Sequence, residues 1–152
     1  MDNNKIISTL NDLIETCRDG FDGFKEAANN VKGPDLKNLF NQLSNERARC
    51  VQELQLEVRR LGGDPEKTGS TAGALHRAWI DIKGTLLGKD DHTILVECER
   101  GEDSAVSAYK EALKLELPTN INVIVQAQYQ TIQKDHDRIK QLRDAKAATS
   151  GR

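Results

Sequence analysis

Apolar residues recur at intervals of three and four positions along four long segments of the chain, and this periodicity constrains the fold most strongly. The expected helices span residues 4–31, 35–61, 93–117 and 121–145. In the first of them the apolar positions are Ile6, Leu10, Leu13, Cys17, Phe21, Phe24, Ala28 and Val31. Such spacing is typical of helices that bury one face in a left-handed bundle. The sequence therefore predicts an all-α four-helix bundle.

The connections between these segments indicate how the helices are ordered. Gly33 and Pro34 separate the first pair and Pro118 separates the second pair, so each pair should form an antiparallel hairpin. A much longer connection, 62–92, joins the two hairpins; it begins with the turn-rich stretch "GGDPEKTGSTAG" and contains a short amphipathic helix over 72–87. A long crossover lets the third helix run parallel to the second, which predicts the ferritin-like topology with a short fifth helix.

Length and charge narrow the possible classes of protein. The 152 residues suit one domain, expected over residues 1–147 and followed by a flexible tail at 148–152. The 22 Lys and Arg residues nearly balance the 24 Asp and Glu residues, so no nucleic-acid partner is expected. The chain shows no basic leader followed by an apolar run, and no stretch approaches the roughly 18 apolar residues of a spanning helix. We therefore expect a cytoplasmic protein without a membrane partner.

Three cysteines, Cys17, Cys50 and Cys98, lie on the apolar faces of three different predicted helices. No Cys-x-x-Cys pair is present. We expect buried free thiols, with a joint metal or redox role as the alternative.

One carboxylate interrupts the apolar stripe of the third helix, because Glu102 falls between Cys98 and Ala105 at helical spacing. Bundles of the ferritin-like topology often hold two metal ions through one Glu from each of two helices and a Glu-x-x-His pair from each of the others. Glu46 in the second helix and His136 in the fourth occupy matching places. Glu46, Glu102 and His136 are therefore candidate ligands for iron or manganese, which accept oxygen and imidazole ligands.

This ligand set is incomplete, which favours another role for the same residues. Arg49 stands where the second helix needs a His, and Gln133 stands where the fourth helix needs a Glu. Because a cation beside the site opposes metal binding, the alternative is an internal network of opposite charges. Its predicted members are Glu46, Arg47, Arg49, Glu102, Asp135 and His136. We expect no bound cofactor; a metal site would need ligands from elsewhere, such as Asp19, Asp22 or Asp135.

Several stretches together resemble a known family: "LNDLIETCRDGFDGFKEAA", "ERARCVQELQLEVRRLGGDP", "GSTAGALHRAWIDIKG" and "ECERGEDSAVSAYKEAL". They are similar to an uncharacterised bacterial family of ferritin-like four-helix-bundle proteins, a domain of unknown function. The segments "LHRAW" and "ERGED" are the most specific, and Glu102 resembles the single Glu on one helix of rubrerythrin and ferritin. The resemblance implies the fold and, by analogy with ferritin-like relatives, a stress-linked cytosolic role; it implies no reaction.

Two classes of function follow. The first is a non-enzymatic structural, stress-related or interaction protein with a degenerate metal site, and the second is a metal-dependent oxidase or metal-storage protein. For the first class, the crossover helix offers a candidate surface for self-association or for a protein partner, because Trp79 is the only Trp and aromatic residues anchor interfaces. The candidate interface residues are Leu75, Trp79, Ile82 and Leu86. The alternative is that Trp79 packs against the bundle as a lid.

Overall fold

The computed structural model describes residues 2–67, 79, 82 and 84–150, with side chains up to 146. Four long helices make up most of these residues: α1 (Asn3–Asn30), α2 (Pro34–Arg60), α4 (Asp91–Leu113) and α5 (Thr119–Ser150). This part of the chain contains no β-strand. The predicted all-α fold with four long helices is confirmed.

Local sequence signals set the helix ends. The Asp2 side chain accepts a hydrogen bond from the Lys5 N–H at 2.9 Å, and the Asp90 side chain accepts one from the Thr93 N–H at 2.8 Å. Both are N-cap interactions that satisfy donors left free in the first helical turn. Pro34 begins α2, where its missing N–H costs no helical hydrogen bond.

The carboxylate of Asp91, at the start of α4, binds the turn of the first hairpin, which is formed by α1 and α2. Asp91 accepts hydrogen bonds from the backbone N–H groups of Lys32 and Gly33 at 2.8 and 3.0 Å. These two N–H groups belong to the turn between α1 and α2, so one side chain joins the two hairpins at this end of the bundle.

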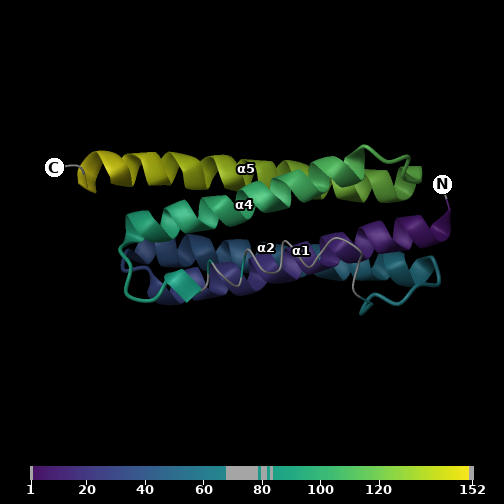
Figure 1. The fold of residues 1–152 in the computed structure, drawn as a ribbon, viewed down its shortest axis with the longest axis horizontal. Coiled ribbons are helices and arrows are strands. Elements are labelled where there is room, and N and C mark those ends of the chain that lie inside the picture. Colours follow the sequence, from purple (N-terminus) through teal and green to yellow (C-terminus); the bar gives the residue numbers. More distant parts are fainter. Residues whose placement is uncertain (1, 68–78, 80–81, 83, 151–152) are drawn as a thin grey trace.

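The helices form two antiparallel hairpins laid side by side (Figure 1). Helix α1 packs against α2 and α4, and α4 packs against α5. In Figure 1, α2 and α4 both run from left to right, whereas α1 and α5 run from right to left. Helix α2 thus ends at the far end from the start of α4, and the connection between them spans about 40 Å, the length of a 27-residue helix. The expected parallel arrangement of these two helices is observed.

Two helix boundaries differ from the prediction by more than two residues. Helix α4 ends at Leu113 rather than at 117, because turn-type hydrogen bonds from Lys114 and Leu115 close its last turn before Pro118. Helix α5 continues to Ser150 rather than ending at 145. Residues 143–149 contain Ala and Lys and no helix breaker, which explains the extension.

The expected crossover helix, 72–87, lies mostly outside the described residues. Positions 79, 82, 84 and 85 are helical. Trp79, Ile82 and Leu86 are buried at 1%, 3% and 0% exposure. Their burial agrees with the alternative in which Trp79 packs against the bundle as a lid; Leu75, the fourth candidate interface residue, lies outside the described residues.

Trp79 is buried because two glycines make room for its ring. A Cβ on Gly23 of α1 would lie 2.1 Å from Cζ3 of Trp79, and a Cβ on Gly101 of α4 would lie 2.1 Å from its Cζ2. The indole also contacts the Phe24 ring edge-on, with centroids 5.7 Å apart. Trp79 thus fills the space between α1 and α4, one helix from each hairpin.

The apolar core consists of two clusters placed one after the other along the bundle. The first cluster is made of buried apolar residues within the ranges Ile6–Cys17, Cys50–Val58, Ala105–Ala112 and Ile121–Ile132. The second cluster is made of buried apolar residues within Phe24–Val31, Leu36–Leu43 and Ile94–Cys98, together with Trp79, Ile82, Leu86 and Ile139. On every helix, an interval of several residues separates the two clusters. The four intervals, 18–23, 44–49, 99–104 and 133–138, define one level of the bundle, which we call the middle level.

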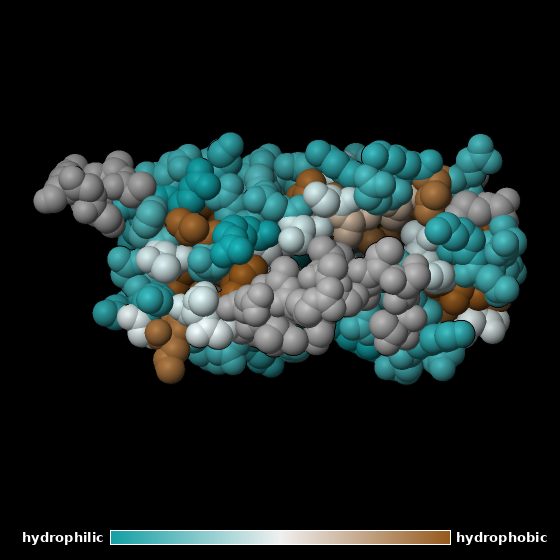
Figure 2. Space-filling view, viewed as in Figure 1, coloured by the Kyte–Doolittle hydropathy of each residue, from teal (hydrophilic) through white to brown (hydrophobic). Residues whose placement is uncertain are grey.

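The outer surface is mainly hydrophilic in the view of Figure 2, with separate apolar spots. Among the described residues the large exposed hydrophobic side chains are Leu56, Leu87 and Val123, which lie on different segments. Isolated apolar residues of this kind are normal on a protein surface. No helix in the described part of the chain is long and apolar enough to cross a membrane.

Candidate functional site

A buried ion pair occupies the middle level. Nη2 of Arg47 lies 2.6 Å from Oε2 of Glu102, and the two side chains are 1% and 0% exposed. Burial lowers the pKa of Arg47, but the attraction and hydrogen bond of Glu102 outweigh it, so the net pKa is raised. Arg47 therefore stays charged, and Glu102 is its direct counter-ion.

Two further carboxylates complete this cluster. Oδ2 of Asp135 lies 3.8 Å from Nη2 of Arg47. Burial, a hydrogen bond to Glu46 and the charge of Glu46 together raise the pKa of Asp135 to about 8. A proton on Asp135 is thus favoured beside the carboxyl group of Glu46. With that proton, the one cation and three carboxyl groups carry a net charge near −1 instead of −2. We call Glu46, Arg47, Glu102 and Asp135 the interior cluster.

Helix α1 approaches Arg47 with a glycine, Gly20, which leaves room for the guanidinium. A Cβ on Gly20 would lie 2.9 Å from Nη1 of Arg47, so the absence of a side chain there admits the guanidinium. The Phe24 ring lies on another side of it, with its centroid 5.2 Å from Cζ of Arg47, a cation–π distance. All four helices therefore shape the surroundings of Arg47.

A chain of thiol, phenol and amide groups adjoins this cluster. Sγ of Cys17 lies 3.1 Å from the hydroxyl oxygen of Tyr109, and that hydroxyl donates to Oε1 of Gln128 at 2.7 Å. A hydrogen bond from Cys50 and the charge of Arg47 lower the pKa of Cys17, whereas its interaction with Cys17 raises the pKa of Cys50. The predicted buried free state of all three cysteines is observed.

Solvent reaches the edge of the interior cluster between α2 and α5. A surface hollow of about 500 Å³ is lined there by Glu46, Arg49, Cys50 and Gln128, among others. Arg49 is exposed, so it belongs to the rim of this hollow and not to the interior cluster. Because successive residues of an α-helix are rotated by about 100°, Arg47 and Arg49 cannot both face inward.

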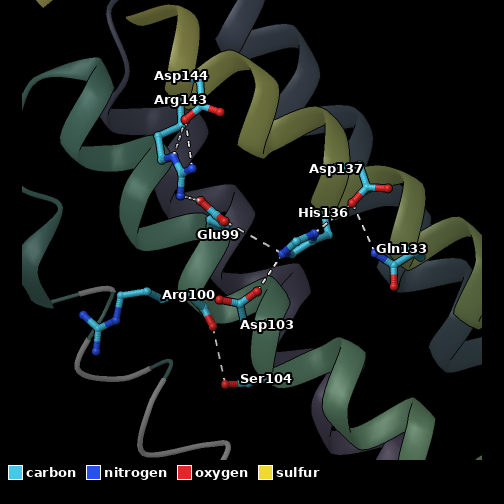
Figure 3. A network of polar contacts seen from close by, with 9 residues as sticks. All are labelled: Glu99, Arg100, Asp103, Ser104, Gln133, His136, Asp137, Arg143 and Asp144. Carbon is cyan, nitrogen blue, oxygen red and sulfur yellow. Dashed lines mark hydrogen bonds and ion pairs between the residues drawn. The ribbon is translucent and has the colours of Figure 1, made fainter. Parts of the chain in front are cut away.

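His136 lies in a second cluster, on the outside of α4 and α5 (Figure 3). Its Nε2 is 2.6 Å from Oδ1 of Asp103 and 3.9 Å from Oε1 of Glu99, and its Nδ1 is 3.1 Å from Oδ1 of Asp137. Arg143 binds the other carboxylate oxygen, Oε2, of Glu99. We call Glu99, Asp103 and His136 the outer cluster. Their ligand atoms all lie within 4.8 Å of one another.

Electrostatics favour a charged imidazole in this setting. Burial lowers the pKa of His136, but hydrogen bonds to Asp137 and Asp103 and the charge of Glu99 outweigh it, so the net pKa is raised. The His136 side chain is 15% exposed and that of Glu99 is 11% exposed. The outer cluster is thus partly shielded from water, which strengthens its interactions relative to a fully exposed ion pair.

The structure brings together four of the six residues predicted for the internal network, which are the members of the interior cluster. It does not bring His136 to Glu46 and Glu102, so these three residues do not form one ligand group. His136 follows Asp135 directly, and because Asp135 faces inward, His136 is turned to the outside. Of the other suggested ligands, Asp19 is buried and Asp22 is exposed.

The partners of His136 were missed by the sequence analysis. Glu99 and Asp103 are four residues apart and therefore share one face of α4, next to the inward face that carries Glu102. That spacing was visible in "ERGED", but the sequence did not show which face of α5 would meet it. The outer cluster depends on the contact between α4 and α5, which brings His136 to Glu99 and Asp103.

Comparison with known proteins identifies a family for the chain but indicates no activity. Residues 5–115 match a family model described as "Domain of unknown function (DUF2383)". This match covers α1, α2 and α4 and ends before α5, so it includes Glu99 and Asp103 but not His136. No curated protein matches the chain.

Proposed function

The chain belongs to the DUF2383 family, and on that premise we propose that it is a non-catalytic ferritin-like bundle protein in which the interior cluster takes the place of a dinuclear metal centre. Its role is structural or directed to a protein partner, in the cytoplasm and in connection with stress. The family description supplies no reaction, so the proposal depends on the middle level of the bundle.

The topology supports the ferritin-like assignment. Two antiparallel hairpins are joined by one long crossover, and α2 runs parallel to α4, as in ferritin-like bundles. In such bundles the metal ligands come from all four helices at one level inside the core. Here the interior cluster lies at the level where the two apolar clusters are separated.

The observation that carries the proposal is the position of Arg47, which is 1% exposed and 2.6 Å from Glu102. A dinuclear centre needs several carboxylates and two imidazoles around its two cations. The interior cluster offers three carboxyl groups, no imidazole and a permanent cation among them. The residues present therefore do not fit two metal ions, and the guanidinium neutralises the carboxylates that metal ions would otherwise bind.

Aerobic titration with ferrous iron tests the proposal. We measure oxygen consumption and ferric absorbance for the natural chain, for Glu102→Gln and for the control Glu111→Gln, which changes an exposed carboxylate of the same helix. We expect no oxidation phase that saturates at two irons per chain, and the same slow background in all three proteins. A phase that saturates at that ratio and is lost only in Glu102→Gln would establish the oxidase alternative instead.

Folding of the variants is checked by circular dichroism. Should Glu102→Gln fail to fold, Asp135→Asn serves as the second interior variant, because Asp135 is 14% exposed and its neutral form is already favoured. Loss of a saturable phase in Asp135→Asn would overturn the proposal in the same way.

A further inference from the structure

We propose that the outer cluster, formed by Glu99, Asp103 and His136, is a binding site for a single divalent transition-metal ion. This site is separate from the interior cluster and goes beyond the proposed function.

The distances between the ligand atoms are close to those that a metal ion imposes. Two ligands bound at about 2.0–2.2 Å, at tetrahedral or octahedral angles, lie about 3 Å apart. Nε2 of His136 is 2.6 Å from Asp103 and 3.9 Å from Glu99. A metal ion therefore requires the first distance to increase and the second to decrease by less than 1 Å each, which side-chain rotation supplies without movement of the helices.

The backbone places the three ligands rigidly. Glu99 and Asp103 are separated by one helical turn of α4, and His136 faces them from α5 (Figure 3). Two carboxylates one turn apart repel each other, and a bound divalent cation removes this repulsion. Ligands on two packed helices hold their geometry better than ligands on a loop.

Each of two ligands has a second contact that fixes its orientation. Nδ1 of His136 donates to Asp137, and Asp137 in turn accepts from the Gln133 side chain at 3.2 Å. Nε2 also lies against a carboxylate, so a metal ion would take the place of the Nε2 proton, while the Nδ1–H bond to Asp137 keeps the ring orientation, as in carboxylate–histidine–metal sites. Arg143 binds Oε2 of Glu99 and leaves Oε1 turned toward His136.

The donor atoms define the class of metal. One imidazole nitrogen and two carboxylate oxygens suit Zn²⁺, Mn²⁺, Fe²⁺, Co²⁺ or Ni²⁺, whereas Ca²⁺ and Mg²⁺ prefer oxygen ligands alone. Three protein ligands leave further coordination positions for water or for an anionic group. Because Asp103 is 61% exposed, these positions face solvent.

The experiment uses the full chain and two probes, Zn²⁺ in calorimetry and Co²⁺ in visible absorption. We expect one ion per chain, and at least a tenfold weaker affinity in Asp103→Asn and in His136→Gln. Asp137→Asn leaves the three ligands in place and should weaken binding by about 10-fold or more, because it releases the orientation of the imidazole. Asp103 is exposed, so Asp103→Asn tests the site without a threat to folding.

His92→Gln is the matched control, because it removes another imidazole carried by α4 and leaves the outer cluster intact. We expect it to bind the probes like the natural chain. Equal binding in the natural chain and in Asp103→Asn, or no binding at all, would mean that the outer cluster is an ion-pair network only and would overturn the proposal. Two ions per chain lost in Glu102→Gln, with binding kept in Asp103→Asn, would instead contradict the proposed function as well.

Discussion

Replacing Arg47 by methionine tests the central role of the interior cluster. Arg47→Met preserves much of the side-chain volume but removes the only cation that contacts Glu102 among the described residues. A buried carboxylate that loses its partner costs about 3–5 kcal/mol. A domain of this size is stable by about 5–15 kcal/mol, so the variant should lose a large part of its free energy of unfolding.

The magnitude translates into a measurable shift. With a urea m-value of about 2 kcal/mol/M, a loss of about 4 kcal/mol lowers the midpoint of unfolding by about 2 M. The assay is urea unfolding followed by circular dichroism at neutral pH. Arg49→Met is the control, because Arg49 is an exposed residue of the same helix and should change stability by about 0.5 kcal/mol or less.

A double variant separates the contribution of the ion pair to stability from the cost of leaving one buried charge without a partner. In Arg47→Met/Glu102→Leu both charges are gone, so most of the lost stability should return, since apolar replacements of a whole buried ion pair are often neutral or stabilising. Our reasoning would be refuted by an Arg47→Met variant that loses less than about 1 kcal/mol, or by a double variant that is no more stable than that single one.

Three other predictions concern stability. Trp79→Ala should cost about 3–5 kcal/mol because the side chain is fully buried, with the mass in solution unchanged; dissociation of an oligomer in light scattering would contradict this. Gly101→Ala should lower the free energy of unfolding by about 1–3 kcal/mol, because the added methyl group clashes with Trp79. In the Trp79→Ala background the same change should have little effect. Thermal melts of the natural chain, the two single variants and the double variant would measure this difference. Because the pKa of Asp135 is raised in the folded chain to about 8 from 3.8, the unfolded chain loses its proton first, so stability should fall as pH rises from about 4 to 8. Urea midpoints at pH 5 and pH 8 should show a smaller decrease in Asp135→Asn than in the natural chain, and equal decreases would disprove this.

The bundle itself could be predicted from the sequence because its determinants are local. Apolar spacing, Gly33-Pro34 and Pro118 fix the helices and the hairpins, and the length of the crossover fixes the direction of α4. The end of α4 was placed four residues too late, since Leu115 and Leu117 continue the apolar pattern while the backbone already turns. Pattern alone does not show where helical hydrogen bonding stops.

The interior cluster was only partly predictable. The stripe position of Glu102 indicated a buried carboxylate that needs a cation, but choosing Arg47 over Arg49 required the rotation of α2 against α4. His136 was assigned to the inside for the same reason, because neighbours on a helix differ by about 100° and a small error in rotation exchanges them. Burial of Trp79 depended on Gly23 and Gly101, which are far from it in sequence, and no local pattern connects the three.

The position of Trp79 also gives the chain a natural fluorescence reporter. Its indole is the only one in the sequence and lies between α1 and α4, so its emission should be that of a dry environment while the two hairpins are packed together and should shift to longer wavelength when they separate. Circular dichroism reports the helices themselves. Coincident transitions by the two signals would indicate that hairpins and helices are lost in one step, whereas an earlier shift in fluorescence would identify a state with intact helices and separated hairpins.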